Sequence, residues 1–298
     1  MKAFITGNDG LAGRVLSRSL SDDGWDIDGI DIRAGGDVRD YETVRAAFDW
    51  EPDAVFHLAA VAQPGEALSD PRRTMDINVT GALNVLEAAR HTRSGARIVL
   101  AGSSEEYGYE GRPECEVLTE DSVCHPSSAY GASKLAATSL GMAYARRYGL
   151  HVIAMRPWNH TGPGRPAAYA ESAFARRVVA VERGEADCVT HGDLSASRDF
   201  TDVRDMVRAY RLAAEKCGPG IYNACSGRVV TMRDVLNILA AQSQAPAVIF
   251  KEDPSLGHRV QGPFPLPSCL KLRDATGWQA EIPLEETLGG LLNYWRAQ

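Results

Sequence analysis

Short apolar runs alternate with longer segments of helical pattern through the first half of the chain. The short runs predict strands at residues 2–6, 26–32, 53–58, 97–102 and 150–155. The longer segments predict helices near residues 11–20, 41–49, 74–93 and 128–149. Near-continuous apolar strands that alternate with helices are typical of a parallel sheet covered on both faces. Repeated right-handed crossovers between such strands give a doubly wound α/β sheet, which is the fold class we predict.

The pattern loosens in the second half of the chain. Helix breakers follow one another at Pro157, Gly162, Pro163, Gly164 and Pro166. Beyond them we predict helices near residues 168–183, 202–216, 231–243 and 284–296. The chain is therefore expected to form a main domain over residues 1–157 and a smaller lobe over residues 158–298. Strands near 187–190 and 220–224 are expected to return from this lobe to the main sheet.

Composition and charge narrow the functional class. The chain has 298 residues, of which 44% are hydrophobic and 24% charged, as in an ordinary soluble enzyme. Its net charge of −7 argues against nucleic acid and anionic membranes as partners. No apolar run approaches the ~20 residues that span a bilayer, and the first strand leaves no room for a signal peptide. Because the six cysteines show no Cys-x-x-Cys spacing, we expect a cytoplasmic protein with reduced thiols and no metal site.

The first predicted strand is joined to the first helix by a glycine-rich turn, Thr6-Gly7-Asn8-Asp9-Gly10-Leu11-Ala12-Gly13. Glycines allow a tight turn and close approach of a pyrophosphate, while the helix N-terminus supplies N–H groups and a positive dipole. The position of this turn in a βαβ unit predicts a dinucleotide-binding Rossmann domain. The predicted contacts to the cofactor are Gly7, Asn8, Asp9, Gly10, Leu11 and Gly13.

The end of the second strand carries residues that would choose between NAD and NADP. The Asp31 carboxylate could accept hydrogen bonds from both ribose hydroxyls and would repel a 2′-phosphate, which favours NAD(H). Arg33 could instead hold that phosphate, so NADP(H) stays open. Asp31 could also be only a cap at the strand end. Asp37 and Val38 follow, where they could bracket the adenine ring.

Two further strand ends meet the same edge of the sheet. Leu58, Ala59 and Ala60 follow the third strand, where small side chains would let a cofactor lie close. We interpret His57, just before them, as a buried core histidine. Ser103 follows the fourth strand, where its hydroxyl could hydrogen-bond a substrate oxygen, although serine is also an ordinary turn former.

Tyr130 and Lys134 are four residues apart in a predicted helix and therefore share one face. An ammonium so close would favour the phenolate and lower the phenol pKa from about 10. The tyrosine would then act as an acid or base at neutral pH, as proton transfer to or from a carbohydrate hydroxyl requires. Such pairs also occur in helices as solvated contacts, so the meaning of this one depends on its setting.

Together these motifs resemble the extended short-chain dehydrogenase/reductase family that acts on nucleotide sugars, the NAD-dependent epimerases and dehydratases. The resemblance covers nearly the whole chain and rests on segments 6–13, 57–60, 78–89, 130–134, 156–159 and 197–205. It implies that Tyr130 is the acid/base, that Lys134 holds the nicotinamide ribose and lowers the tyrosine pKa, and that Ser103 binds the sugar oxygen. It also implies cofactor contacts from Asn78, Tyr130, Lys134 and Pro157, and a homodimer formed by the helices at 74–93 and 128–149.

The resemblance further implies a nucleotide-sugar substrate whose diphosphate is contacted by Asn159 and Arg198. Arg198 could instead form a surface ion pair with Asp199 or Asp202. Arg259 would be a second phosphate ligand, although the usual Arg-Pro of the family is Arg-Val here.

Within the family, segments 103–108, 156–164, 198–205 and 222–227 resemble the reductases of GDP-6-deoxy-4-keto-mannose. Arg165 stands where those reductases commonly carry glutamine. A 4,6-dehydratase remains an alternative function, because family dehydratases carry a glutamate at the position of Glu105. Glu105 and the neighbouring Ser104 would both contact the substrate. A 4-epimerase stays open too, because it needs only the tyrosine, lysine and serine. A protein of a different class, a catalytically silent cofactor-binding regulator, could be built on the same fold.

Overall fold

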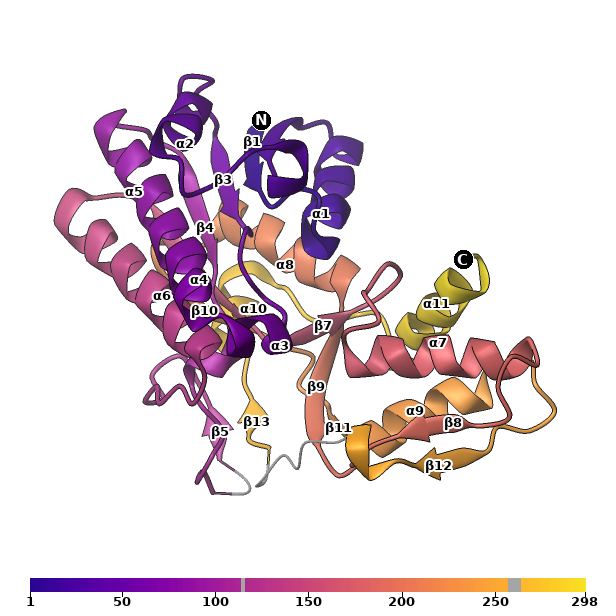
Figure 1. Cartoon of the computed structure of the whole chain (residues 1–298). Coiled ribbons are helices and arrows are strands. Elements are labelled where there is room, and N and C mark those ends of the chain that lie inside the picture. The colour runs from indigo at the N-terminus through magenta and orange to yellow at the C-terminus, as the bar shows by residue number, and fades with distance from the viewer. Residues whose placement is uncertain (114–115, 257–263) are drawn as a thin grey trace.

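A six-stranded sheet forms the centre of the larger domain in the computed structural model, which describes residues 1–113, 116–256 and 264–298 (Figure 1). The strand order is β10-β6-β4-β3-β1-β2, and every neighbouring pair is parallel. The strands are β1 (Lys2–Thr6), β2 (Asp26–Ile30), β3 (Ala54–His57), β4 (Arg97–Ala101), β6 (Val152–Pro157) and β10 (Gly220–Ala224). The order reverses between β1 and β3, and ligands bind at the carboxyl ends of strands beside such a reversal.

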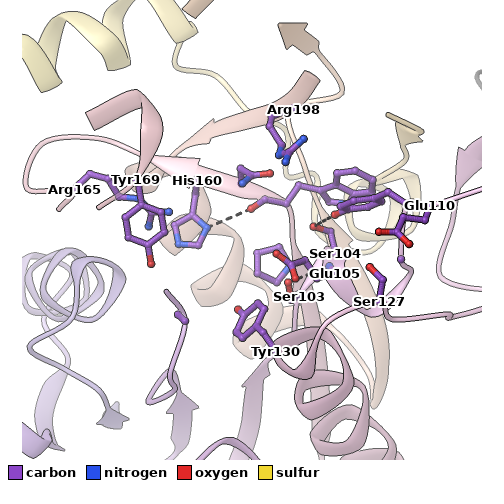
Figure 2. Close-up of a pocket in the computed structure, with 16 residues that line it drawn as sticks. Ser103, Ser104, Glu105, Glu110, Ser127, Tyr130, His160, Arg165, Tyr169 and Arg198 are labelled. Atoms are coloured by element: carbon purple, nitrogen blue, oxygen red, sulfur yellow. Dashed lines mark hydrogen bonds between the residues drawn. The ribbon is translucent and has the colours of Figure 1, made fainter. Parts of the chain in front are cut away.

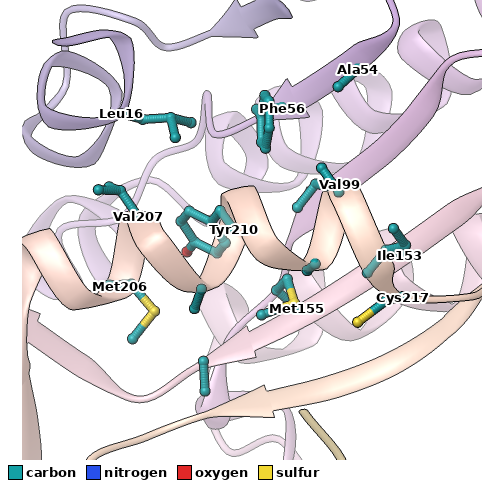
Figure 3. Close-up of a cluster of buried hydrophobic side chains, with 14 of the residues drawn as sticks. Leu16, Ala54, Phe56, Val99, Ile153, Met155, Met206, Val207, Tyr210 and Cys217 are labelled. Carbon is teal, nitrogen blue, oxygen red and sulfur yellow. The ribbon is translucent and has the colours of Figure 1, made fainter. Parts of the chain in front are cut away.

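Helices cover both faces of this sheet, as a doubly wound fold requires. On one face lie α1 (Leu11–Asp22) and α8 (Val203–Lys216), whose apolar stripes bury Leu16, Val207 and Tyr210 against Phe56 and Met155 of the sheet (Figure 3). On the other face lie α2 (Tyr41–Phe48), α5 (Gly81–His91) and α6 (Ala129–Tyr148), over a second core. Strand β10 and helix α8 come from the second half of the chain, yet both belong to these layers.

The helix predicted at 74–93 is a succession of shorter segments. It begins with α4 (Pro71–Met75), continues through the π-helical segment η2 (Asp76–Thr80) and ends as α5. A further short helix, α3 (Pro64–Ser69), precedes it. The Asp70 side chain accepts a hydrogen bond from the Arg73 backbone at 2.9 Å, and Pro71 occupies the first helical turn, so these two residues start the helix earlier than predicted.

The smaller lobe has its own sheets and its own core. β7 (Asn159–Thr161), β9 (Ser197–Asp202) and β11 (Val229–Thr231) form a three-stranded sheet. Helices α7 (Ala170–Glu182), α9 (Met232–Ala241) and α11 (Leu284–Arg296) enclose the core of this lobe. The strand predicted at 187–190 is β8 (Val189–His191), which pairs with β12 (Phe250–Glu252). Our expectation that it returns to the main sheet is therefore wrong.

Short elements lie between these two parts of the chain, and a one-turn 3₁₀-helix, η4 (Pro254–Leu256), follows β12. β5 (Val117–Leu118) pairs with β13 (Leu266–Pro267), and α10 (Leu270–Thr276) packs against α8 and β10. β7 begins two residues after β6 ends, and α8 follows directly on β9. The smaller lobe is thus attached at the carboxyl edge of the main sheet, where the candidate site lies.

Candidate active site

A groove of about 300 Å³ lies at the carboxyl edge of the sheet, where β1, β2 and β3 end. Nine of the residues predicted to contact a cofactor line it: Gly7, Gly10, Asp31, Arg33, Asp37, Val38, Leu58, Ala59 and Ala60. Asn8, Asp9, Leu11 and Gly13 belong to the same turn and the start of α1, but they are not part of the lining. The groove also takes in residues that the sequence did not point to, among them Arg39, Val61, Glu66, Arg73 and Ile77.

The glycines of the first turn allow neighbouring backbone segments to lie in close contact. Gly7 has a φ of +74°, and a Cβ at this position would lie 2.8 Å from the Ala59 backbone nitrogen. A Cβ at Gly13 would overlap the Gly7 carbonyl oxygen. Gly10 lines the groove and precedes α1, and no side chain caps this helix, so the N–H groups of its first turn have no side-chain partner at this end. This arrangement fits the pyrophosphate of a dinucleotide.

Asp31 both caps a turn and faces the groove. Its carboxylate accepts hydrogen bonds from the backbone of Arg33 at 2.9 Å and of Asp9 at 3.2 Å, so it caps the short 3₁₀-helix η1 (Ile32–Ala34) that replaces the end of the predicted strand. It also lines the groove. The Arg33 guanidinium donates to the Asp9 carbonyl at 2.8 Å and lies in the same wall.

Asn78 supports the groove from behind rather than lining it. Its side-chain oxygen accepts a hydrogen bond from the Val61 backbone at 2.8 Å, and its nitrogen donates to the Ser133 hydroxyl at 2.8 Å. The residue is buried within the π-helical segment. Asn78 therefore ties the strand-end loop to α6.

A second cavity, of about 550 Å³, adjoins the groove, since Val61 lines the groove and Ala62 lines the cavity. Seven predicted site residues line it together: Ser103, Ser104, Glu105, Tyr130, Pro157, Asn159 and Arg198 (Figure 2). They come from the ends of β4 and β6, the start of α6, and the strands β7 and β9. Segments far apart in the sequence thus converge on one site.

Tyr130 and Lys134 lie on the first two turns of α6, as their spacing predicts. The Lys134 ammonium lies 5.9 Å from the centroid of the Tyr130 ring and donates a hydrogen bond to the Ala101 carbonyl at 2.6 Å. Lys134 is buried, whereas Tyr130 is half-buried and lines the cavity. The lysine is therefore buried against the end of β4, whereas the tyrosine is accessible from the cavity.

The predicted lowering of the Tyr130 pKa is not what this structure gives. Burial of the phenol raises its pKa, the Glu105 carboxylate adds to this, and hydrogen bonding to Ser103 opposes it. Burial also lowers the pKa of Lys134 to about 8, against the opposing effect of Glu106. Loss of water around the phenol therefore outweighs any help from the nearby ammonium, and Tyr130 is protonated at neutral pH.

A buried ion pair holds the loop that carries Ser103. The Glu106 carboxylate accepts hydrogen bonds from Arg156 Nε at 2.7 Å, from Thr138 at 3.0 Å and from the Ser103 backbone at 2.9 Å. Ser103 and Glu106 form a capping box around the 3₁₀-helix η3 (Ser104–Glu106). Our sequence reasoning missed Glu106, although the Ser-x-x-Glu spacing of the box is a signal that could have found it.

Glu105 and Ser104 lie on the same loop but face different partners. Glu105 Oε2 accepts a hydrogen bond from the Ser128 hydroxyl at 2.9 Å, and Ser128 also caps α6. The carboxylate is thereby held close to the start of the helix that carries Tyr130. Ser104 accepts a hydrogen bond from the Tyr109 hydroxyl at 2.7 Å and is buried.

Arg198 does not form a surface ion pair with either neighbouring aspartate. Asp199 accepts hydrogen bonds from Ser226, and Asp202 is paired with Arg204 at 2.9 Å. The Arg198 guanidinium donates to the Ser197 carbonyl at 2.6 Å and packs 5.4 Å from the Phe264 ring centroid. The predicted phosphate ligand Arg259 lies outside the described residues.

His57 is a core residue, as its place on a buried strand predicts. It is buried, and its Nδ1 lies 2.8 Å from the Thr6 hydroxyl. Burial, helped by the positive charge of Lys134, lowers the pKa of His57 to about 3. The ring is therefore neutral at physiological pH.

The cavity also contains residues that the motifs did not single out as site residues. They include Tyr109, Glu110, Ser127, Trp158, His160, Arg165 and Tyr169. Burial and the charge of Arg165 lower the pKa of His160 to about 4, so this ring is also neutral at pH 7. They lie between β4 and α6 or in and around β7, where periodicity gives no signal.

Two further findings concern membrane spans and metal sites in the part of the chain that the structure describes. Every helix in this part of the chain is too short or too polar to cross a bilayer. The same residues contain no group of three or more histidine, cysteine, aspartate or glutamate side chains that could hold a metal ion.

The profile of the NAD dependent epimerase/dehydratase family matches residues 3–225, and the chain belongs to this family. It is 31% identical over 301 residues to GDP-6-deoxy-D-mannose reductase of Pseudomonas aeruginosa, with 100% of this chain and 98% of the relative covered. The structure of RMD from Pseudomonas aeruginosa complexed with NADPH is similar at a TM-score of 0.89 and 30% identity, and the likeness covers 99% of each chain. UDP-glucose 4-epimerase of Thermus thermophilus complexed with NAD is similar at 0.86 and 28% identity, again over 99% of each chain. The predicted family and fold class are thus confirmed.

Proposed function

We propose that this protein is a nucleotide-sugar oxidoreductase that reduces the C4 keto group of an NDP-4-keto-6-deoxyhexose, with GDP as the favoured nucleotide. The observation that carries the proposal is that the groove and the cavity adjoin. A groove built for a dinucleotide opens beside a cavity that presents a tyrosine and a serine hydroxyl together. The full-length likeness to a GDP-6-deoxy-D-mannose reductase supports the choice of reaction.

Several residues in and around the cavity would each have a distinct role in such a reduction. When bound, the reduced nicotinamide supplies a hydride to the carbonyl carbon. Tyr130 donates a proton to the carbonyl oxygen, and its raised pKa means that the phenol is protonated when the reaction begins. Ser103 hydrogen-bonds the same oxygen and shares its developing charge. We assign Lys134 to the nicotinamide ribose, and Asn159 and Arg198 to the diphosphate of the substrate.

The cofactor is NAD(H) or NADP(H). The carboxylate of Asp31 at the groove favours NAD(H), as the strand-end position suggests. The guanidinium of Arg33 in the same wall, together with a relative whose structure contains NADPH, supports NADP(H). Steady-state kinetics with each reduced cofactor in turn would decide between them.

The test of the reductase is direct. The purified protein, given GDP-4-keto-6-deoxymannose and NADPH or NADH, should consume reduced cofactor and form GDP-6-deoxyhexose. Absence of consumption with this substrate and with the UDP- and dTDP-linked 4-keto sugars would exclude the proposed reaction. A catalytically silent binder would bind cofactor and be indifferent to Tyr130→Phe in every assay.

A 4,6-dehydratase is the second candidate, and the placement of Glu105 supports it. The carboxylate lines the cavity and is held by Ser128 near the start of α6. A dehydratase would convert GDP-mannose without added reductant, and Glu105→Gln should abolish that conversion. A reductase should retain turnover in the same variant. A 4-epimerase would interconvert two nucleotide sugars with no net change in the cofactor.

We also infer a cytoplasmic homodimer. Free thiols at Cys124, Cys188, Cys217, Cys225 and Cys269 support a reducing compartment. The exposed sides of α5 and α6 are the candidate interface. Of the small residues that could allow close packing there, Ala88 and Ala137 are buried within the chain, whereas Ala136 is half-buried and Ala143 exposed. Light scattering coupled to gel filtration would give the oligomeric state.

A further inference from the structure

Arg165 is a charged residue fixed in the wall of the cavity (Figure 2). Its Nε lies 3.3 Å from the Glu171 carboxylate, and its guanidinium stacks on Tyr169 with 3.4 Å between Cζ and the ring centroid. The backbone around it is anchored as well, since the Ser172 hydroxyl donates to the Arg165 carbonyl at 2.6 Å. The side chain is only 13% exposed and that of Glu171 only 6%. The orientation of the guanidinium is thus fixed before any ligand arrives.

The terminal nitrogens of this guanidinium are not used by the protein. Within the described residues, the Arg165 side chain makes no hydrogen bond, and its one ion-pair contact is through Nε. A guanidinium presents its two terminal NH₂ groups as a rigid fork that matches two oxygens of a phosphate. Because stacking and pairing already restrict the side chain, binding an anion here costs little further conformational entropy.

The loop that carries Arg165 lies between two places where phosphates are expected. A Cβ added at Gly164 would lie 3.6 Å from Leu11 and 3.7 Å from Arg14, so the loop touches the start of α1 beside the glycine turn. Arg165 also shares its cavity with Arg198 and Asn159. The position is therefore within the region where a cofactor and a nucleotide sugar would meet.

We propose that Arg165 binds a diphosphate, either that of the nucleotide sugar or that of the dinucleotide cofactor. The inference rests on the proposed function, because it names a ligand contact in that same site. The one acidic group within ion-pair reach of Arg165 among the described residues is Glu171, and a diphosphate adds the negative charge that the fork is free to accept. Arg165 would then determine affinity for the anionic part of the ligand and not for the base or the sugar.

The experiment measures binding in Arg165→Gln by isothermal titration calorimetry with GDP, UDP, guanosine and NADPH. Arg176→Gln is the matched control, because Arg176 is an exposed arginine on α7 outside the cavity lining. If Arg165→Gln does not fold because Glu171 loses its partner, the double variant Arg165→Gln/Glu171→Gln replaces it. Arg165→Lys keeps the charge but not the fork, and should be intermediate.

Each outcome supports or overturns the assignment of Arg165 to a diphosphate. A loss of about tenfold or more in affinity for the nucleoside diphosphate, with guanosine and NADPH within twofold of wild type, assigns Arg165 to the nucleotide sugar. The same loss confined to NADPH assigns it to the cofactor. Unchanged affinity for every phosphorylated ligand overturns the inference while leaving the reductase intact. A wild-type protein that binds neither GDP nor UDP overturns the favoured GDP-linked substrate, and the NADPH measurement still tests Arg165.

Discussion

Arg156 Nε lies 2.7 Å from the Glu106 carboxylate, and both side chains are almost completely buried beneath the loop that carries Ser103. The two residues are fifty positions apart, one at the end of β6 and the other after β4. Arg156 also stacks on Tyr107, with 4.7 Å between Cζ and the ring centroid. The pair therefore joins two strand ends at the loop that carries Ser103.

Glu106→Gln should destabilise the protein by about 3 kcal/mol, because it leaves the buried Arg156 guanidinium without its counter-charge. Glu87→Gln is the matched control, since Glu87 pairs with Arg90 at 2.8 Å but both side chains are partly exposed. The control should lose less than about 1 kcal/mol. Urea unfolding of the three proteins gives the comparison, and equal losses in the two variants would contradict a special role for the buried pair.

Tyr130→Phe should lower kcat by about 10²–10⁴-fold, because the proton that neutralises the new alkoxide comes from this hydroxyl. The Kd for NADPH should stay within about twofold of wild type, since the change removes one oxygen from the cavity and not from the groove. Tyr144→Phe is the control on the same helix; its hydroxyl bonds Glu87 at 2.6 Å, away from the site. Stopped-flow measurement of cofactor oxidation separates the two constants. Retention of wild-type kcat would remove Tyr130 from the mechanism.

The pattern of apolar runs was sufficient to predict the centre of the main sheet, because β1, β3, β4 and β6 are mostly buried and therefore read as nearly continuous hydrophobic segments. The predicted strands at 2–6 and 97–102 match β1 and β4 within one residue. β8 could not be assigned in this way. It has three residues, and its partner β12 lies some sixty positions further along, so no local signal says which sheet it joins.

Some residues of the candidate site could likewise be predicted from the sequence, and others could not. The residues on the glycine turn and at strand ends could be predicted, because a parallel sheet brings carboxyl ends to one edge. The capping-box spacing could have found Glu106 but not its ion pair with Arg156, which only the tertiary fold provides. Arg165 could not be assigned a role, because its partners Tyr169 and Glu171 are also known only from the fold. The predicted direction of the Tyr130 pKa shift was wrong for a related reason. Sequence spacing reports the neighbouring charge but not the loss of water around the phenol.

Arg33→Ala should raise the KM for NADPH by about tenfold and leave that for NADH within about twofold, if this guanidinium binds the 2′-phosphate at the groove. Arg18→Ala on α1 is the control, because Arg18 is exposed and outside the groove lining. The ratio of kcat/KM for the two cofactors is the measured quantity. An unchanged ratio would mean that Arg33 serves only to brace the Asp9 carbonyl, to which it donates at 2.8 Å.

His57 should make the protein acid-sensitive. Its pKa is lowered to about 3 in the folded state, so between pH 6.5 and 3 the unfolded chain binds a proton that the native His57 does not. Stability must therefore fall as the pH falls through this window, by about 1.4 kcal/mol per pH unit well below 6.5. His57→Asn removes this contribution while His160, whose pKa is lowered to about 4, remains in both proteins. Chemical unfolding at pH 6 and pH 5 should show the wild type losing about 1 kcal/mol more than the variant over this interval. Parallel stability curves would show that His57 is not held neutral by the core.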